Sequence, residues 1–334
     1  MLALAAFSAL GPRRARAPPP APAVLRERHA FFFAALLKDN APILGAWATE
    51  LKALIARVAP SPVYVSILEN GDSVDGTAAA LRRLAADLRA AGVPHTVVTE
   101  PLLARQGGED RVPWLARLRN AALAPLGAAF APAALATRTP RIVFLNDVVF
   151  AAEDLASLIS TDEGRFDVAC GLDFFFEFYD TWVARDAAGA PLSGNFPYFA
   201  GAEDAMRVRT GQPVRARSCW NGAAVMDAAP FLDGRVAFRA LPDTSECTVV
   251  CEDLAAAGFG RVVINPGVVV AYTRGWWLFH AYAAGFMHPF QYLLGALQLR
   301  SPRVRGGGRG GRGASVAVGP PAGGAKKTAA VASI

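Results

Sequence analysis

Several familiar signatures are missing from this sequence of 334 residues. No GxGxxG segment follows the first predicted strand and no GxxxxGK[ST] segment occurs, which excludes the usual dinucleotide fingerprint and the P-loop. There are only four cysteines, and no paired Cys or His motif supplies the ligands of a zinc site. They are either buried free thiols or form one or two disulfides, whose pairing the sequence does not rank.

Long hydrophobic runs are also scarce. Residues 1–10 are apolar, but they are too short to span a bilayer and lack the basic start of a signal peptide. Residues 275–299 carry no formal charge and are long enough to cross a membrane, yet two His, a Pro and two Gln interrupt them. We expect an apolar aromatic helix there, either packed on the domain or associated with a membrane.

The net charge of +6 comes from the two ends of the chain. Residues 1–28 hold five Arg and one Glu, and residues 300–334 hold five Arg and two Lys without an acid. The intervening residues 29–299 hold 22 basic and 27 acidic side chains, a net charge of −5. Both ends are rich in Pro, Gly and Arg, which predicts disordered tails. The acidic body is not built to hold nucleic acid; an RNA contact through the Arg-Gly-Gly run of the tail stays a separate hypothesis.

With 53% hydrophobic residues the chain has enough apolar surface for a sizeable core. From residue 61 onward, strand and helix patterns alternate. Apolar, β-branched runs predict strands at 62–68, 95–99, 141–145 and 166–170, and helical patterns cover 77–91, 112–126 and 153–159. Such alternation favours an α/β domain with a mostly parallel sheet, whose ligands bind beyond the carboxyl ends of the strands.

Acidic residues follow these predicted strands. Glu69 and Asp75 come after the first, Asp147 after the third and Asp173 after the fourth. Asp75 either caps the following helix or, like Glu69, accepts hydrogen bonds from a nucleotide base or ribose. Asp147 stands where the carboxylate of a DxD motif would stand, so we expect it to bind Mn²⁺ or Mg²⁺. Asn146 offers only a neutral carbonyl, so a bound diphosphate would supply much of the coordination.

The chain resembles the fungal capsule-associated α-1,3-mannosyltransferases, glycosyltransferase family 69, from about residue 31 to 273. The resemblance rests on seven blocks in order: SILENGDSVDGT (66–77), RVPWLARLRNAAL (111–123), RIVFLNDVVFAAEDL (141–155), FDVACGLDF (166–174), FYDTWVARDAAGAPL (178–192), SCWNGAAVMDAAPF (218–231) and SECTVVCEDLAAAGFGRVVINPGVVVAY (245–272).

This resemblance implies a GT-A-like fold in one domain, residues 29–274, with a mixed, mostly parallel sheet. It implies a retaining, metal-assisted enzyme that moves mannose from GDP-mannose to the 3-hydroxyl of an α-mannoside. It also implies the Golgi or secretory pathway, where members are anchored by an N-terminal transmembrane helix, although we expect no such anchor in residues 1–28. The alternative is an inactive or glycan-binding relative of the same fold.

The remaining blocks supply candidate site residues. Arg119 and Asn120 are predicted to bind the donor diphosphate, with a surface arginine as the alternative. Trp220 and Asn221 suit a sugar ring and its hydroxyls, or else a core indole beside a turn. By comparison with GT-A enzymes, the catalytic carboxylates are Glu252 and Asp253, with Glu246 and Asp173 as further candidates. Acids near a helix start also favour its dipole without a catalytic role. The 179–192 segment predicts a hairpin beside the acceptor.

Overall fold

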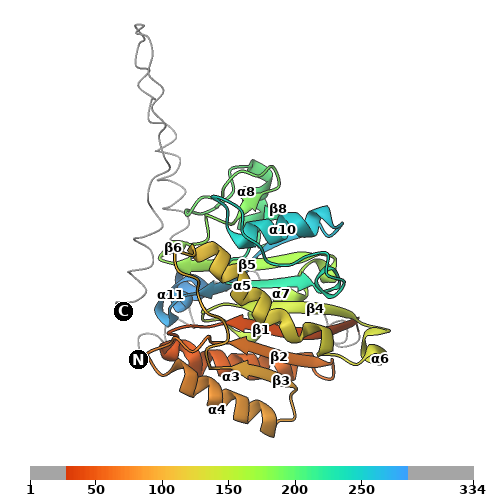
Figure 1. Cartoon of the computed structure of the whole chain (residues 1–334). Coiled ribbons are helices and arrows are strands. Elements are labelled where there is room, and N and C mark those ends of the chain that lie inside the picture. The colour runs from red at the N-terminus through yellow and green to blue at the C-terminus, as the bar shows by residue number, and fades with distance from the viewer. Residues whose placement is uncertain (1–27, 285–334) are drawn as a thin grey trace, which may run out of the picture. The chain divides into compact units, whose positions relative to one another are not determined.

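The computed structural model describes residues 28–284. Within them lies one ten-stranded sheet with the order β3-β2-β1-β4-β9-β5-β10-β8-β7, in which β6 pairs with β5 (Figure 1). Strands β1 to β5 and β10 run in one direction, and β6, β8 and β9 run in the other. The strands are β1 (His29–Leu36), β2 (Val63–Leu68), β3 (His95–Val98), β4 (Thr139–Leu145), β5 (Val168–Phe175), β6 (Glu177–Phe178), β7 (Arg185–Asp186), β8 (Val214–Ser218), β9 (Ala223–Asp227) and β10 (Val262–Ala271).

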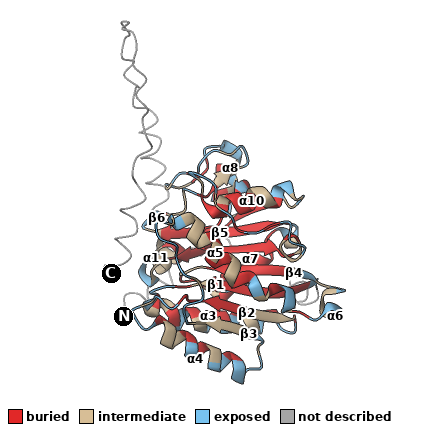
Figure 2. Cartoon of the chain, viewed as in Figure 1, coloured by how far each residue is buried: buried red, intermediate tan, exposed pale blue. Residues whose placement is uncertain are grey.

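Helices cover both faces of the sheet. One face packs against α3 (Ala41–Val58), α4 (Thr77–Ala90) and α7 (Ala152–Ile159), and the other against α5 (Arg111–Leu123) and α10 (Glu246–Ala256). Figure 2 shows the central strands as the buried layer. Shorter helical segments are η1 (Ala124–Ala128), α6 (Pro132–Leu135), η2 (Thr161–Gly164), α8 (Ala202–Arg209), α9 (Ala229–Leu232), α11 (Arg274–Leu278) and the π-helix η3 (Phe279–Ala283).

Strand β1 shows how the sequence builds this layer. Successive side chains of a strand point to opposite faces. Accordingly, Phe31 and Phe33 belong to the core under α3 and α4, while Phe32 belongs to the core under α5 and α10. All three rings are at most 1% exposed. A strand covered on both faces needs a continuous apolar run, as the FFF sequence provides.

The α/β class and the mixed, mostly parallel sheet are confirmed. From residue 61 onward, the predicted strands and helices correspond to β2, α4, β3, α5, β4, α7 and β5, with ends that differ by a few residues. The predicted hairpin is present around residue 188, where the Asp186 N–H donates to the Ala190 carbonyl at 2.9 Å.

Two predictions need correction, and two elements, strand β1 and helix α3, were not predicted. Asp173 lies inside β5, which extends to Phe175, rather than in a loop after it. Glu252 and Asp253 lie inside α10, which already begins at Glu246, rather than just before a helix.

The predicted tails and residues 285–299 of the apolar segment lie outside the described residues. The described beginning of that segment forms α11 and η3. Of the helices within 28–284, none combines the length and hydrophobicity that a membrane crossing requires.

Candidate active site

Polar residues meet at the carboxyl edge of the parallel strands. Asn40 follows β1 and Asp147 follows β4, and the Asn40 side chain hydrogen-bonds the Asp147 carboxylate. The Asn40 backbone N–H donates to the Thr77 hydroxyl at the start of α4, over 2.7 Å. The loops after β1, β2 and β4 are thereby joined, because the carboxyl ends of parallel strands share one edge.

Glu69 and Asp75 lie in the loop after β2, and their oxygens are used differently. Asp75 accepts hydrogen bonds from the backbone N–H of Ala41 at 2.9 Å and of Thr77 at 3.0 Å. Although burial raises its pKa, these bonds and that from the Thr77 hydroxyl lower it on balance. Glu69 is fully buried, and its Oε1 accepts the N–H groups of Asp72 and Ser73. Its Oε2 has no partner in the described structure. Asp75 therefore stabilises the starts of α3 and α4, and Glu69 keeps a free acceptor.

Arg119 is the buried cation of the site. Its Nε donates to Glu246 Oε1 at 3.0 Å and its Nη1 to Asn146 Oδ1 at 3.4 Å. Its guanidinium lies over the Trp220 ring, 4.5 Å from the centroid. The structure thus brings three predicted residues, Arg119, Asn146 and Glu246, into one hydrogen-bonded group.

Asp147 lies beside this group and is partly buried. Burial raises the pKa of its carboxyl, and the positive charges of Arg119 and Arg111 and the hydrogen bond from Asn40 oppose that rise. The carboxylate is therefore not fully compensated by the protein, and a cation would stabilise its ionised form.

A second pair of carboxyl groups adjoins the first. Asp173 is fully buried and accepts the Tyr272 hydroxyl at 3.1 Å and the Asp180 N–H at 3.2 Å. Burial, and then the neighbouring charge of Asp180, hold the pKa of Asp173 well above its usual value. Burial also raises the pKa of Asp180. Two carboxyl groups in such surroundings do not both ionise readily.

Asp180 and Tyr272 were not among the predicted site residues. Asp180 was seen only as part of the 179–192 hairpin. It reaches Asp173 because the chain reverses after β5, where the Tyr179 N–H donates to the Asp173 carbonyl at 3.0 Å. No short sequence motif signals that reversal.

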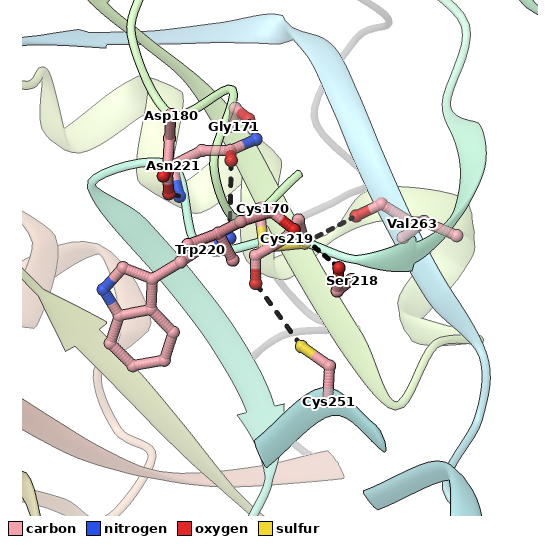
Figure 3. Close-up of a disulfide and its surroundings, with 10 residues drawn as sticks. Cys170, Gly171, Asp180, Ser218, Cys219, Trp220, Asn221, Cys251 and Val263 are labelled. Atoms are coloured by element: carbon pink, nitrogen blue, oxygen red, sulfur yellow. Dashed lines mark hydrogen bonds between the residues drawn. A yellow bond between two sulfur atoms is a disulfide. The ribbon is translucent and has the colours of Figure 1, made fainter. Parts of the chain in front are cut away.

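Trp220 and Asn221 form the turn that precedes β9 (Figure 3). The Asn221 amide donates to the Gly171 carbonyl at 2.8 Å, and its backbone N–H donates to Asp180 Oδ2 at 3.1 Å. A disulfide between Cys170 and Cys219 ties the same turn to β5. Trp220 is 3% exposed, and Arg119 covers one face of its ring. Both side chains therefore serve packing in this structure, and Asn221 also positions Asp180.

The side chain of Asn120 also has a structural role, because its hydrogen bonds are made within the protein. Its amide donates to the Phe238 carbonyl at 2.7 Å and accepts the Phe238 N–H at 2.9 Å. Asn120 thereby fixes the chain at Phe238, whose ring lies edge-on to Trp220.

Glu252 and Asp253 are placed apart from Arg119 and Asp147. Glu252 pairs with Arg217 at 3.3 Å, and both side chains are largely exposed. Asp253 pairs with Arg239 through both carboxylate oxygens, at 2.7 Å each. Asp253 lies about two helical turns beyond Glu246, roughly 10 Å along α10. The structure groups Glu246 and Asp173 with Asp147, but not these two residues.

Within residues 28–284, no three His, Cys, Asp or Glu side chains are arranged to hold a metal ion. Asp147, with the neighbouring amide of Asn146, nevertheless supplies the oxygen atoms that Mg²⁺ and Mn²⁺ prefer. Burial raises the pKa values of Asp147, Asp173 and Asp180, and the charge of Asp180 adds to the rise at Asp173, so a bound cation would favour their ionised forms. The residues present therefore fit a divalent cation that receives further ligands from its substrate.

Residues 30–253 match the family described as Cryptococcal mannosyltransferase 1. Alpha-1,3-mannosyltransferase CMT1 of Cryptococcus neoformans var. neoformans is 29% identical over 266 residues, which cover 67% of this chain and 53% of that protein. The chain thus spans about half the length of this curated relative.

Among solved structures, Staphylococcus aureus TarS 1-349 is similar, with a TM-score of 0.38 and 14% identity over 78% of this chain and 68% of that chain. Its complex with UDP gives a TM-score of 0.37 at 14% identity, over 81% and 70% of the two chains.

Proposed function

This chain belongs to the Cryptococcal mannosyltransferase 1 family, and on that premise we propose that it is a mannosyltransferase which moves mannose from GDP-mannose to the 3-hydroxyl of an α-mannoside. The family match covers the strands and loops that carry Glu69, Arg119, Asp147 and Asp173. The observation that carries the proposal is the convergence of Arg119, Asn146 and Asp147 at the carboxyl edge, where α/β proteins bind nucleotides.

Two features support a nucleotide-sugar donor. Arg119, and Arg111 at the start of α5, provide positive charge near Asp147 for a diphosphate. Asp147, with Asn146, would hold Mn²⁺ or Mg²⁺. The ion would supply neutralisation of the negative charge on the departing diphosphate. Glu69 is a further candidate for the base or ribose, a contact that requires its buried Oε2 to become accessible on binding.

The reaction we propose retains the configuration at C1 of mannose. The bond from C1 to the phosphate oxygen breaks and its electron pair stays on that oxygen. The acceptor oxygen bonds to C1 on the same face, and the hydroxyl proton passes to the departing phosphate. Asp180, which is less buried than Asp173, stabilises the positive charge that develops at C1. Asp173 and Tyr272 orient Asp180 and its loop, and Glu246 holds Arg119 in place.

We further propose that the protein works in the secretory pathway, in the Golgi. The Cys170–Cys219 disulfide supports this location, because disulfides form and persist in oxidising compartments.

An assay of transfer tests the proposal. The purified full chain is incubated with GDP-mannose, Mn²⁺ and an α-mannoside, and the product linkage is determined. We expect an α-1,3-linked product, its loss in Asp147→Ala, and its retention in Asp87→Ala, which removes an exposed carboxylate on α4. Absence of product from the wild type would refute the assignment as a mannosyltransferase. Mannoside binding without nucleotide binding would instead identify a glycan-binding relative, and full activity of Asp147→Ala would refute the metal assignment alone.

A further inference from the structure

An exposed aromatic residue stands at the edge of the sheet that carries the acidic side chains. Phe176 is 69% exposed, and it links β5 to β6, where Phe175 pairs with Glu177. Its backbone φ of +70° lies in the left-handed region, which bulky residues rarely adopt. A large apolar side chain is thus held towards solvent at a position that glycine would occupy with less strain. Such outliers favour a functional role.

The surroundings of Phe176 fix its position. The His280 Nε2–H donates to the Phe176 carbonyl at 2.9 Å, and the His280 ring stacks on Phe174 with centroids 3.8 Å apart. Trp276 meets Phe176 edge to face at 5.4 Å, and Phe279 meets Trp276 at 5.9 Å. Two segments about 100 residues apart in sequence, the turn from β5 to β6 and the α11–η3 segment, therefore build one aromatic surface. It is formed by the exposed Phe176 and the half-buried Trp276 and Phe279.

This aromatic surface adjoins the carboxyl pair. Phe176 lies between Asp173 and Asp180 in the reversal that brings these two residues together. Tyr272, which donates to Asp173, precedes α11 and packs against Tyr179 with ring centroids 4.7 Å apart. The tyrosine pair thus lies beside the buried acids, and Phe176 lies in the chain reversal that joins these acids.

We propose that Phe176 and Trp276 bind the acceptor glycan by stacking on its sugar rings, beyond the residue that receives mannose. The inference rests on the proposed function for the identity of the glycan. Aromatic side chains offer large apolar faces with few rotatable bonds, and they suit the C–H faces of neutral sugars. Trp220, the indole that the sequence had suggested for this purpose, is buried.

The charges around the surface favour a neutral ligand over an anionic membrane. Glu177 and Arg274 flank it, both are exposed, and their charges cancel. Binding to anionic lipid headgroups would instead require a cluster of basic residues.

The decisive variant is Phe176→Gly, which removes the ring and fits the local φ. We expect its thermal stability to stay close to that of the wild type, because relief of the backbone strain offsets the lost contact with Trp276 and the greater freedom of glycine in the unfolded chain. We expect the KM for an α-mannooligosaccharide acceptor to rise about tenfold, which corresponds to about 1.4 kcal/mol. The acceptor KM is compared with the KM for GDP-mannose, because a general loss of the site's structure would raise both and loss of the stacking ring would raise the acceptor KM selectively. Phe176→Tyr should restore the acceptor KM, and Met206→Ala, which removes an exposed apolar side chain on α8, should leave it unaltered.

Direct binding separates this inference from the proposed function. The affinity of the full chain for the α-mannooligosaccharide is measured by calorimetry without donor. If the wild type transfers no mannose but binds the glycan, and Phe176→Gly weakens binding about tenfold, the glycan-binding surface is supported and the proposed transferase activity is refuted. If the wild type transfers mannose and Phe176→Gly leaves both the acceptor KM and the affinity unchanged, the glycan-binding surface is refuted and the transferase activity is supported. If the wild type binds phosphatidylcholine vesicles, and Phe176→Gly loses this binding but keeps the wild-type acceptor KM, the surface binds lipid and the glycan-binding inference is refuted.

Discussion

Arg119 and Glu246 are buried together, and this pairing determines what each substitution does. Removing Glu246 leaves a guanidinium without its carboxylate partner in the interior, which is costly because the charge has already lost its hydration. We predict that Glu246→Ala lowers the free energy of unfolding by about 3–5 kcal/mol. Urea denaturation measures the effect.

Glu252→Ala provides the matched control on the same helix. It breaks an ion pair with Arg217 in which both side chains are largely exposed, so the expected loss is about 0–1 kcal/mol. Equal losses in the two variants would contradict the assigned burial of the Arg119–Glu246 pair.

Asp173 predicts a pH dependence of stability. Its pKa is raised in the folded state by burial and by Asp180, so the folded protein keeps a proton that the unfolded chain releases. The contribution of Asp173 to stability is therefore complete below the unfolded pKa and declines as the pH rises towards the folded one. Asp173→Asn should make the decline in stability above about pH 4 less steep.

Denaturation of the wild type and Asp173→Asn at several pH values from 4 to 8 tests this expectation. Asp87→Asn, at an exposed carboxylate, should follow the wild type. If the free energies of unfolding of the wild type and of Asp173→Asn change in parallel with pH, the pKa of Asp173 does not differ between the folded and unfolded states.

The sequence placed a site residue correctly where its position depends on neighbouring residues in the chain, and it failed where the position depends on tertiary contacts. Asp147 and Glu69 stand directly after strands, so a sequence pattern places them at the correct edge. Asp180 and Tyr272 reach Asp173 only through the chain reversal at Phe176 and the packing of β10 beside β5. Trp220 has residue chemistry that suits a sugar, but its burial follows from tertiary contacts with Arg119 and Phe238.

At the level of elements, the turn before β9 is fastened twice, by the Asn221 side chain and by the Cys170–Cys219 disulfide. The disulfide closes a sequence separation of 49 residues, which restricts the unfolded chain. We predict that reduction lowers the free energy of unfolding by about 2–4 kcal/mol and also lowers transfer activity, since the turn positions Asp180.

A comparison of reducing and oxidising conditions measures both effects. The double variant Cys170→Ala/Cys219→Ala is the control, because it should be insensitive to dithiothreitol. If dithiothreitol lowers the stability and activity of the double variant as much as those of the wild type, the effect comes from other thiols. Cys247 and Cys251, which are free and buried, are examples.

Elements with amphipathic patterns were predicted well, and those without them were not. Helix α4 repeats leucine at positions 81, 84 and 88, all of which are buried, and polar residues lie between them. Strand β1 is apolar on both faces, so it lacks the alternation that identifies a half-exposed strand. Its role as a central strand depends on β2 and β4, which join it from either side.

At the scale of the whole molecule, the acidic body would bind a nucleotide diphosphate through Arg119, Arg111 and a divalent cation on Asp147. We predict that GDP-mannose with Mn²⁺ stabilises the protein by about 2.7 kcal/mol at a hundredfold excess over Kd, since the ligand binds only the folded state. Thermal unfolding with and without Mn²⁺ measures the effect.

In Asp147→Ala the part of this stabilisation that depends on Mn²⁺ should disappear. UDP-glucose at the same concentration serves as the control for base and sugar selectivity. Equal protection by both donors would contradict the assignment of GDP-mannose while leaving a nucleotide-sugar site in place.

The reversed strand β9 also determines the order in which the fold can be completed during synthesis. Strand β4 ends at Leu145, but its neighbour on one side, β9, begins only at Ala223. A nascent chain that ends between these residues presents the unpaired edge of β4, and such edges promote association with other chains. Because β9 also joins β4 to β5, the two parts of the sheet meet only after most of the domain has been made. Folding of this protein therefore depends on contacts between distant residues, which slows it and favours assistance by chaperones.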